Sequence, residues 1–244
     1  MKRDLISKLV DMMCDATVYA LTGAGISTES GIPDFRSPGG LWEEVDPMEY
    51  LSREALQRRP RKFWGFLRET VRPISDAAPN AGHRALAEME KLGYIEGVIT
   101  QNIDNLHQQA GSQNVLEVHG HLRTAHCTSC ESVVSLQKAF DQIQGEDVPA
   151  CDQCGGDLRP DVVLFGDQMA ADFQTAVDAA RQTDMVLAVG SSLSVSPANM
   201  LAVNAPRLAI INRTATACDS LADIVIHGNA GETLQAVVEE MRRR

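Results

Sequence analysis

The sequence has no apolar run of membrane-spanning length, no internal repeat and no low-complexity tract. A transmembrane helix needs about 20 consecutive apolar residues. Residues 1–16, MKRDLISKLVDMMCDA, place apolar side chains at helical spacing between charged ones, which predicts an amphipathic helix and not a signal peptide. We therefore expect a cytoplasmic protein that has no membrane partner.

Basic residues are also scarce. The 244-residue chain has 22 lysines and arginines against 33 aspartates and glutamates, and its net charge is −11. Such a chain is poorly suited to grip phosphate backbones, so we expect no direct nucleic-acid partner. The negative charge has two possible uses, to keep the protein in solution or to attract a basic peptide. The locally basic stretch at 53–68 is interrupted by glutamate and predicts a solvated helix face.

The composition that remains is typical of a globular α/β protein, with 44% apolar and 23% charged residues. The length suits one large domain or one domain with a smaller insert. Apolar runs rich in Val, Ile and Leu alternate with helical patterns, which predicts a Rossmann-like, doubly wound parallel sheet. We expect strands at 17–23, 94–100, 114–120, 161–166, 184–190, 207–212 and 223–228, and helices at 47–73, 80–93 (with Asn80 as N-cap), 170–182 and 231–243.

Four of the six cysteines form two C-x-x-C pairs that are separated by twenty residues. In a cytosolic chain this spacing predicts zinc rather than disulfides. Four thiolates complete a tetrahedral site and leave no position for water, so the metal is expected to be structural. His126 adjoins the first pair but is not expected to bind the metal, and Cys14 and Cys218 are expected in the core. The predicted ligands are Cys127, Cys130, Cys151 and Cys154.

A glycine-rich turn, LTGAGISTESGIPDFR (21–36), follows the first expected strand. Gly23 and Gly25 have G-x-G spacing, but the turn lacks a P-loop lysine, and Thr28 replaces the sixth residue of a G-x-G-x-x-G fingerprint. Glycines let backbone amides approach a pyrophosphate, and a following helix N-terminus favours negative charge. The alternative is a turn that only connects a strand to a helix.

Polar side chains follow two other expected strands. Gln101, Asn102 and Asp104 offer amide and carboxylate groups suited to ribose hydroxyls and a carboxamide, although they also suit a helix start that caps itself. His119 ends the next strand, and an imidazole can accept a proton at neutral pH. Ligands of open α/β sheets bind beyond the carboxyl ends of the strands, so we expect these residues to converge on one crevice.

Five motifs in order resemble the sirtuins, the NAD-dependent protein-lysine deacylases of the silent-information-regulator family. They are SGIPDFR, TQNIDNLH, EVHG, the cysteine pairs and GSSLSVSPA. The resemblance covers nearly the whole chain, as far as HGNAGETL, and is to prokaryotic-type, single-domain members. It implies NAD as co-substrate, structural zinc and an acyl-lysine protein or peptide as substrate.

The resemblance also implies individual roles. Gln101 would contact ribose, Asp104 and the Ile103 backbone would bind the nicotinamide carboxamide, Phe35 would cover the nicotinamide and Arg36 would help hold phosphate. The implied catalytic residues are His119, as general base, with Asn102 and Asp104. The implied cofactor-binding residues are Gly23, Ala24, Gly25, Ser27, Thr28, Asp34, Phe35, Arg36, Gln101, Asn102, Ile103, Asp104, Gly190, Ser191, Ser192, Asn212 and Ala230.

The reaction implied by the resemblance transfers the acyl group from lysine to ADP-ribose. The acyl oxygen attacks the ribose carbon as nicotinamide leaves. His119 then deprotonates a ribose hydroxyl, which attacks the imidate, and water releases free lysine and an O-acyl-ADP-ribose. The missing sixth glycine is expected here, because the loop must enclose and release nicotinamide rather than present it for hydride transfer.

Two strand-like segments, DVVLFGD and SVSPA, correspond to those that sandwich the peptide in the family. The residues expected to line the acyl-lysine tunnel are Val163, Phe165, Gly166 and Val195. Asp167 stands where the family usually has glutamate. Members that prefer succinyl-lysine carry Tyr-x-x-Arg, which aligns with Leu67 and Thr70, while Arg68 is expected to point elsewhere. We therefore expect acetyl or longer apolar acyl groups.

The expected architecture has a Rossmann-like NAD-binding domain with two insertions, a helical module and a small zinc-ribbon domain. Their bounds are 1–36, 74–121 and 160–244 for the first, 37–73 for the helical module and 122–159 for the zinc module. Two other functions remain open, a mono-ADP-ribosyltransferase and a catalytically idle module that binds NAD or ADP-ribose. The intact His119, Asn102 and Asp104 argue against the idle module.

Overall fold

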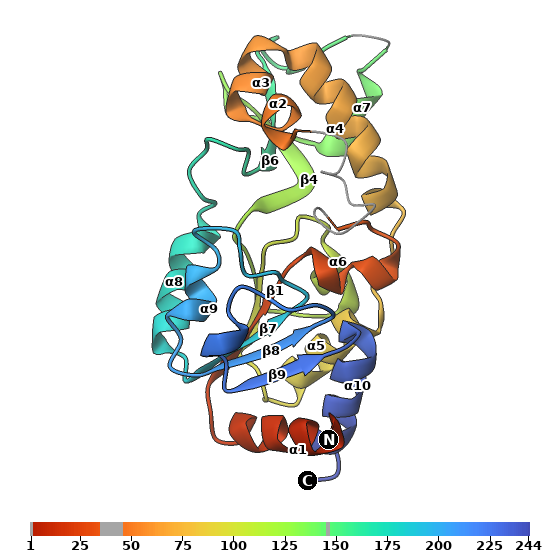
Figure 1. Cartoon of the computed structure of the whole chain (residues 1–244). Coiled ribbons are helices and arrows are strands. Elements are labelled where there is room, and N and C mark those ends of the chain that lie inside the picture. The colour runs from red at the N-terminus through yellow and green to blue at the C-terminus, as the bar shows by residue number, and fades with distance from the viewer. Residues whose placement is uncertain (1, 35–45, 145–146) are drawn as a thin grey trace.

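A six-stranded parallel sheet forms the larger part of the molecule in a computed structural model, which describes residues 2–34, 46–144 and 147–244 (Figure 1). The strand order is β3-β2-β1-β7-β8-β9, and all neighbours run parallel. The predicted doubly wound sheet is confirmed, with each strand shorter than predicted. The strands are β1 (Val18–Thr22), β2 (Gly97–Thr100), β3 (Val115–Glu117), β7 (Met185–Val189), β8 (Leu208–Asn212) and β9 (Ile224–His227).

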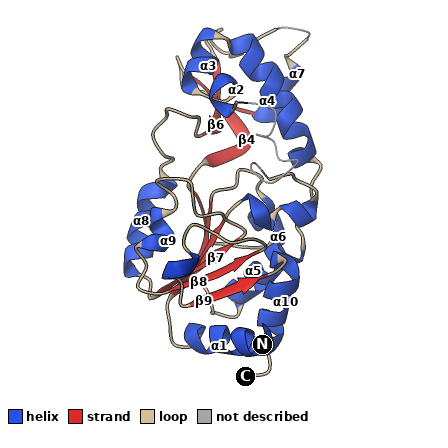
Figure 2. Ribbon diagram, in the orientation of Figure 1, coloured by secondary structure: helices blue, strands red, loops and turns tan. Residues whose placement is uncertain are grey.

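Helices cover both faces of this sheet (Figure 2). Strand β7 is buried on both sides, with Leu187 packed in the core under α1, α5 and α10 and Val186 in the core under α8 and α9. This explains why its sequence is continuously apolar. Within the described ranges, no helix is both long and apolar enough to cross a membrane. The helices are α1 (Lys2–Met13), α5 (Ala81–Lys91), α6 (Leu106–Ala110), α8 (Asp172–Gln182), α9 (Met200–Val203) and α10 (Ala230–Met241).

Helix α5 begins and ends as predicted. The Asn80 side chain accepts hydrogen bonds from the backbone N–H groups of Gly82 and His83, and the His83 side chain accepts from the Asn80 N–H in return. This capping box satisfies N–H groups that have no partner within the helix. Gly93, at φ +79°, follows the C-cap residue Leu92 and turns the chain toward β2.

A second, antiparallel sheet has the order β5-β4-β6. The predicted parallel strand at 161–166 is wrong, because β6 ends at Val162 and pairs with β4 outside the large sheet. An apolar run alone does not specify which sheet a strand joins. The strands are β4 (Gly120–Cys127), β5 (Val133–Ser135) and β6 (Leu158–Val162).

The predicted helical and cysteine segments share one apolar core. Phe63 and Trp64 of α4 are fully buried with Leu136 of α7 and Leu158 of β6. Figure 1 shows these elements together at the end of the molecule opposite α1. The helices, with the short η3 of the large sheet's last connection, are α2 (Pro47–Tyr50), α3 (Arg53–Arg58), α4 (Pro60–Ser75), α7 (Leu136–Asp141) and η3 (Asp219–Leu221).

Candidate active site

The loops after β1 and β7 pack against each other at the point where the strand order of the large sheet reverses. The Gly25 N–H donates to the Gly190 carbonyl oxygen at 2.8 Å, and the Gly23 N–H donates to that of Val189 at 3.2 Å. Ligands of doubly wound folds bind at such a switch point, outside the carboxyl ends of the strands.

The glycines of the turn are also needed for packing between two loops, which was not predicted from the sequence. A Cβ on Gly25 would lie 2.7 Å from the Gly190 carbonyl oxygen, and one on Gly190 would lie 2.2 Å from the Ile26 nitrogen. The missing Cβ atoms thus let the two loops touch. Within residues 24–34, two short 3₁₀ turns follow the first glycine, η1 (Ala24–Ile26) and η2 (Thr28–Ser30).

Gly25→Ala should therefore destabilise the protein. Its methyl group would meet backbone and not a flexible side chain, so we expect the free energy of unfolding to fall by roughly 1–3 kcal/mol. Urea unfolding followed by circular dichroism measures this loss. Gly65→Ala is the control, because a Cβ there meets nothing within 4 Å and alanine favours helix α4. Equal midpoints for the two variants would contradict the prediction.

Ser27 joins the glycine turn to the polar loop that follows β2. Its hydroxyl donates to Asp104 Oδ2 at 2.7 Å and accepts from Asn102 Nδ2 at 3.1 Å. The Asn102 amide also donates to the Gly23 carbonyl oxygen at 3.2 Å. Burial raises the pKa of Asp104, while its hydrogen bonds to Leu106 N–H and Ser27 oppose that rise. The structure thus brings together the predicted polar residues of two loops.

The alternative of a self-capping helix start holds in part. Asp104 Oδ1 accepts from the Leu106 N–H at 3.0 Å, at the first residue of α6. The other carboxylate oxygen faces Ser27. One side chain therefore both starts the helix and fixes the loop.

His119 lies where β3 leads into β4, and its position is set from two sides. Its Nδ1 is 2.8 Å from the Gln101 carbonyl oxygen, and its own carbonyl oxygen accepts from the Val163 N–H at 2.9 Å. A carbonyl oxygen can only accept, so the ring proton is on Nδ1 and the lone pair is on Nε2. Burial lowers the pKa of His119, and the hydrogen bond to Gln101 partly offsets this. The imidazole is thus a neutral base at neutral pH.

The other cofactor-binding candidates lie near the carboxyl ends of the strands. Gln101 Nε2 donates to Ser191 Oγ at 3.0 Å, which links the loops after β2 and β7. Ser192 is exposed, Asn212 ends β8, and Ala230 begins α10. Ala24, Thr28, Ile103 and Asp34 lie on the same loops, whereas Phe35 and Arg36 fall outside the described residues.

Two buried histidines that were not predicted as part of the site contact these loops. The ring centroids of His83 and His107 are 4.9 Å apart, and burial lowers their pKa values to about 4 and about 3. His83 Nε2 lies 3.4 Å from Ser27 Oγ, and His107 Nε2 lies 2.9 Å from Thr22 Oγ1. Both rings therefore stay neutral. The Asn80-x-x-His83 capping pattern and the histidine in TQNIDNLH were the available signals.

The first of the two segments expected to bind the peptide contacts His119, whose carbonyl oxygen accepts from the Val163 N–H. The Phe165 N–H and C=O pair with Leu51 and Arg53, and the Phe165 side chain is 43% exposed. Gly166, at φ +87°, ends the segment. Val195 lies in a bend, so the expected second strand is wrong, since turns with a cis Ser196–Pro197 peptide replace it.

The structure shows the surroundings of the residues at which this sequence differs from the family pattern, namely Asp167 and the α4 residues Leu67 and Thr70. Asp167 is buried against Arg159 and accepts from the Leu164 N–H at 2.8 Å, so its carboxylate faces inward. Leu67 is 3% exposed in the core, Thr70 is half-buried, and Arg68 donates to the Ile143 carbonyl oxygen at 3.0 Å. Arg68 thus points away from the site, as predicted.

The four predicted zinc ligands form one cluster. All four sulfurs lie within 4.8 Å of one another, and the Cys127–Cys154 and Cys130–Cys151 pairs are 3.5 and 3.7 Å apart. Sulfurs at 2.3 Å from a tetrahedral zinc are about 3.8 Å apart, so the donors and their spacing fit this metal. His126 instead lies with Nδ1 2.6 Å from Asp161 Oδ1.

Outside the cluster, the prediction for the two other cysteines is half right. Cys218 is buried, as expected, but Cys14 is exposed at the end of α1. The basic stretch at 53–68 is largely a solvated face, as expected.

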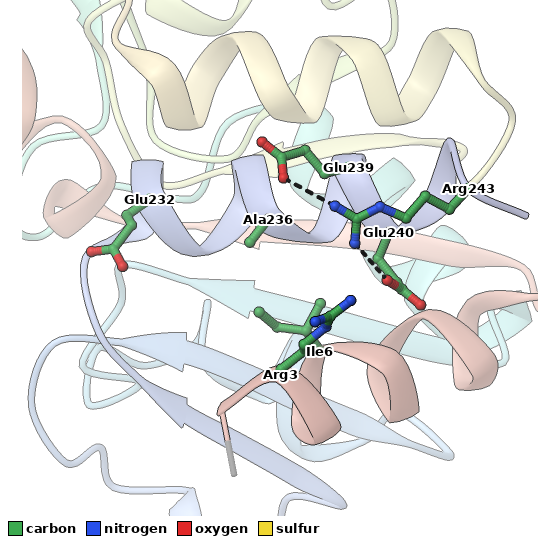
Figure 3. Close-up of a pocket in the computed structure, with 7 residues that line it drawn as sticks. All are labelled: Arg3, Ile6, Glu232, Ala236, Glu239, Glu240 and Arg243. Carbon is green, nitrogen blue, oxygen red and sulfur yellow. Dashed lines mark hydrogen bonds and ion pairs between the residues drawn. The ribbon is translucent and has the colours of Figure 1, made fainter.

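A cavity of about 330 Å³ lies between α1 and α10 (Figure 3). Arg243 pairs there with Glu239 at 3.6 Å and Glu240 at 3.3 Å. Its lining residues are Arg3, Ile6, Glu232, Ala236, Glu239, Glu240 and Arg243. None of His119, Asn102 and Asp104 lines this cavity, so it is separate from the candidate site.

Comparison with known proteins bears on this arrangement. A sequence model of the Sir2 family matches residues 23–197, which include both glycine loops, the polar loop, His119 and the cysteines. The chain belongs to the Sir2 family. One Sir2 relative, NAD-dependent protein deacetylase 2 of Caldanaerobacter subterraneus subsp. tengcongensis, is 50% identical over 238 residues, covering 96% of this chain and 95% of the relative. The NAD-dependent protein deacetylase of Sulfurisphaera tokodaii is 45% identical over 240 residues, covering 96% and 95%.

Solved Sir2 structures share the whole fold. A structure described as a Sir2 complex with a p53 peptide and NAD⁺ has a TM-score of 0.88 and 34% identity, with 97% of this chain and 98% of that chain covered. Another, from work on the mechanism and regulation of Sir2 enzymes, has a TM-score of 0.89 and 39% identity and covers 98% of both chains. The match extends beyond the large sheet, so the helical and cysteine segments belong to the common fold.

Proposed function

We propose that this protein is an NAD-dependent protein-lysine deacetylase or deacylase, which transfers the acyl group from lysine to ADP-ribose and releases nicotinamide. Family membership and the names of the relatives support this. The observation that carries it is a neutral His119 whose Nδ1–H is held by Gln101, leaving Nε2 available as a base. The backbone of His119 binds Val163, so a substrate on that segment would lie beside the imidazole.

The loops at the switch point would hold NAD. Bound NAD supplies the sugar–base bond that is broken and the ribose hydroxyl that receives the acyl group. Gln101 and Ser191 offer polar groups from the loops after β2 and β7. Asn212, at the end of β8, and Ala230, at the start of α10, would contribute from the other half of the sheet. The proposed set also includes Gly23, Ala24, Gly25, Ser27, Thr28, Asp34, Phe35, Arg36, Ile103, Gly190 and Ser192.

Asn102 and Asp104 would act as a unit with Ser27. Ser27 donates to Asp104 and accepts from Asn102, so each side chain restricts the other two. Fixed polar groups stabilise developing charge without reorganising during the reaction. We assign these residues to the nicotinamide end, with Asp104 and the Ile103 backbone on the carboxamide.

The acyl-lysine would lie along Val163, Phe165 and Gly166, with Val195 on the opposite side. Solved Sir2 structures carry acetylated and deacetylated peptides, which supports a peptide partner for this chain. The uncharged Leu67 and Thr70, with Arg68 held by Ile143, favour acetyl or longer apolar acyl groups over succinyl. The inward-facing Asp167 leaves peptide binding to backbone pairing.

Zinc held by the four cysteines would organise the 122–159 module, and the chemistry would lie in the NAD-binding domain of 1–36, 74–121 and 160–244. The helical module, 37–73, shares its core with the zinc module, so we expect the two to move together. Zinc thiolates persist in reducing compartments, which supports the cytoplasm as the location.

Mono-ADP-ribosyl transfer is the second candidate, because it uses the same cofactor and bond cleavage. The test is to incubate the protein with NAD and an acetyl-lysine peptide and to follow nicotinamide, deacetylated peptide and O-acetyl-ADP-ribose by mass. All three are expected in equal amounts. Nicotinamide without deacetylated peptide would favour the transferase. If none of the three products is formed, the result would favour an idle binding module.

The activity should persist at mildly acidic pH. Because burial lowers the pKa of His119 below 6.5, the neutral base survives as the pH falls toward that lowered value and is lost only below it. We expect kcat/KM for the peptide to rise with pH through a midpoint below 6.5. Carbon-13 NMR of the histidine rings, assigned with His119→Asn, separates this titration from that of Asp104. A His119 midpoint above 6.5 contradicts the prediction.

A further inference from the structure

A buried carboxylate lies two residues before His119 and has no part in the proposed chemistry. The Glu117 side chain, at the end of β3, is 8% exposed. A buried charge is costly unless it is paired and hydrogen-bonded. Its partners therefore matter for the strand end that carries His119.

Arg123 of β4 supplies both hydrogen bonds of a fork to this carboxylate. Its Nη1 is 2.7 Å from Glu117 Oε1, and its Nη2 is 2.5 Å from Glu117 Oε2. Gln108 of α6 adds a third bond to Glu117 Oε1 at 2.9 Å. Two-pronged pairs of this kind fix orientation as well as charge.

The same guanidinium also reaches the polar loop. Arg123 Nη1 donates to Asn105 Oδ1 at 2.9 Å, and the neighbouring Leu122 N–H donates to the Ile103 carbonyl oxygen at 3.2 Å. Asn105 has φ +63° and is the N-cap residue of α6, directly after Asp104. Strand β4 thus binds the loop of residues 101–105 through one backbone and one side-chain hydrogen bond.

We propose that Arg123 is a positioning residue, which holds the loop of residues 101–105 in register with the strand end that carries His119. Its hydrogen bonds go to Glu117 and Asn105 and not to His119 or to residues 163–166. A surface ion pair usually contributes little, and Arg123 itself is 39% exposed. Here, however, one guanidinium connects two segments that flank the base, and its carboxylate partner is buried.

The inference rests on the proposed function, and Arg123→Ala tests it. We expect kcat to fall at least about 10-fold, because small displacements of aligned groups cost up to about 100-fold. The KM of the acetyl peptide should change less than about 2-fold, since Arg123 forms its hydrogen bonds with Glu117 and Asn105 and not with residues 163–166. Arg242→Ala is the matched control, because it removes a two-nitrogen pair with Glu88 on the far helices and should leave kcat unchanged.

A second pair of variants separates positioning from general loss of structure. Asn105→Gly keeps the positive φ but removes the contact with Arg123. If Arg123 acts through the loop, the double variant should lose much less than the product of the two single losses. Arg123→Lys, which keeps the charge without the fork, covers the case in which Arg123→Ala does not fold, and its kcat should fall about 3-fold or more.

Amide hydrogen exchange provides a readout that does not require activity. Residues 101–109 should exchange faster in Arg123→Ala than in Arg242→Ala. Unchanged exchange with unchanged kcat overturns the positioning role, as do fully multiplicative losses in the double variant. A wild-type protein that releases no deacetylated peptide refutes the proposed function instead, and the exchange result then still decides the inference.

Discussion

Replacing Cys130 and Cys154 with serine should abolish zinc binding and open the core beneath the cysteines. Structural zinc contributes on the order of 10 kcal/mol in small zinc-binding peptides, more than the stability of many domains. Cys127 and Cys151 are themselves buried in the core that α4 shares with β6. Losing the metal should therefore expose α4 as well as the cysteine segment.

Trp64 makes this loss measurable. It is fully buried in that core, whereas Trp42, the other tryptophan, can be replaced by phenylalanine to leave a single fluorophore. In the Trp42→Phe background we expect the emission of Trp64 to shift to the red, while most of the circular dichroism of the large sheet and its helices remains. Metal analysis should give about one zinc per chain before the change and almost none after it.

Cys14→Ser is the control, since Cys14 is exposed and lies outside the cluster. It should keep both the zinc and the emission of Trp64. Zinc retained by the double serine variant would refute the ligand assignment. If zinc is lost while the emission of Trp64 does not change, the idea that zinc stabilises the shared core is refuted.

The parts of this structure that the sequence predicts are those with local signals. The strand β7, MVLAV, is apolar at every position because both of its faces are covered. The two C-x-x-C pairs predict their own cluster, because four ligands of one metal must converge wherever the chain places them. The start of α5 follows from the Asn80 side chain, which satisfies backbone groups within three residues.

The parts that the sequence does not predict depend on distant pairing. The segment at 161–166 is as apolar as a parallel strand, but β6 pairs with β4 near the cysteines. The sequence around Gly25 suggests contact with a ligand. In the structure, however, a side chain at this position would collide with the backbone of Gly190, 165 residues later in the chain. Glu117 and Arg123 are only six residues apart, yet the residues between them do not indicate that the turn from β3 to β4 brings the two side chains together.

His119→Ala should lower kcat the most of any substitution considered for the site. A general base typically contributes about 10²–10⁴-fold, and we expect a loss of at least that order with little change in unfolding midpoint. His119 makes its side-chain hydrogen bond to the Gln101 backbone and belongs to neither apolar core of the large sheet, so its removal leaves those cores intact. Steady-state rates of deacetylation, with thermal unfolding of the same preparation, measure both quantities.

His119→Asn distinguishes a base from a structural imidazole. The asparagine amide can donate to the Gln101 carbonyl oxygen as Nδ1–H does, but it has no basic atom in place of Nε2. If His119 only positions the loop, the asparagine variant should recover most of the activity. If it removes a proton, the asparagine variant should be as slow as the alanine variant while its unfolding midpoint matches the wild type. Recovery of turnover by His119→Asn would therefore refute the catalytic role and leave His119 as a structural link between β3 and the polar loop.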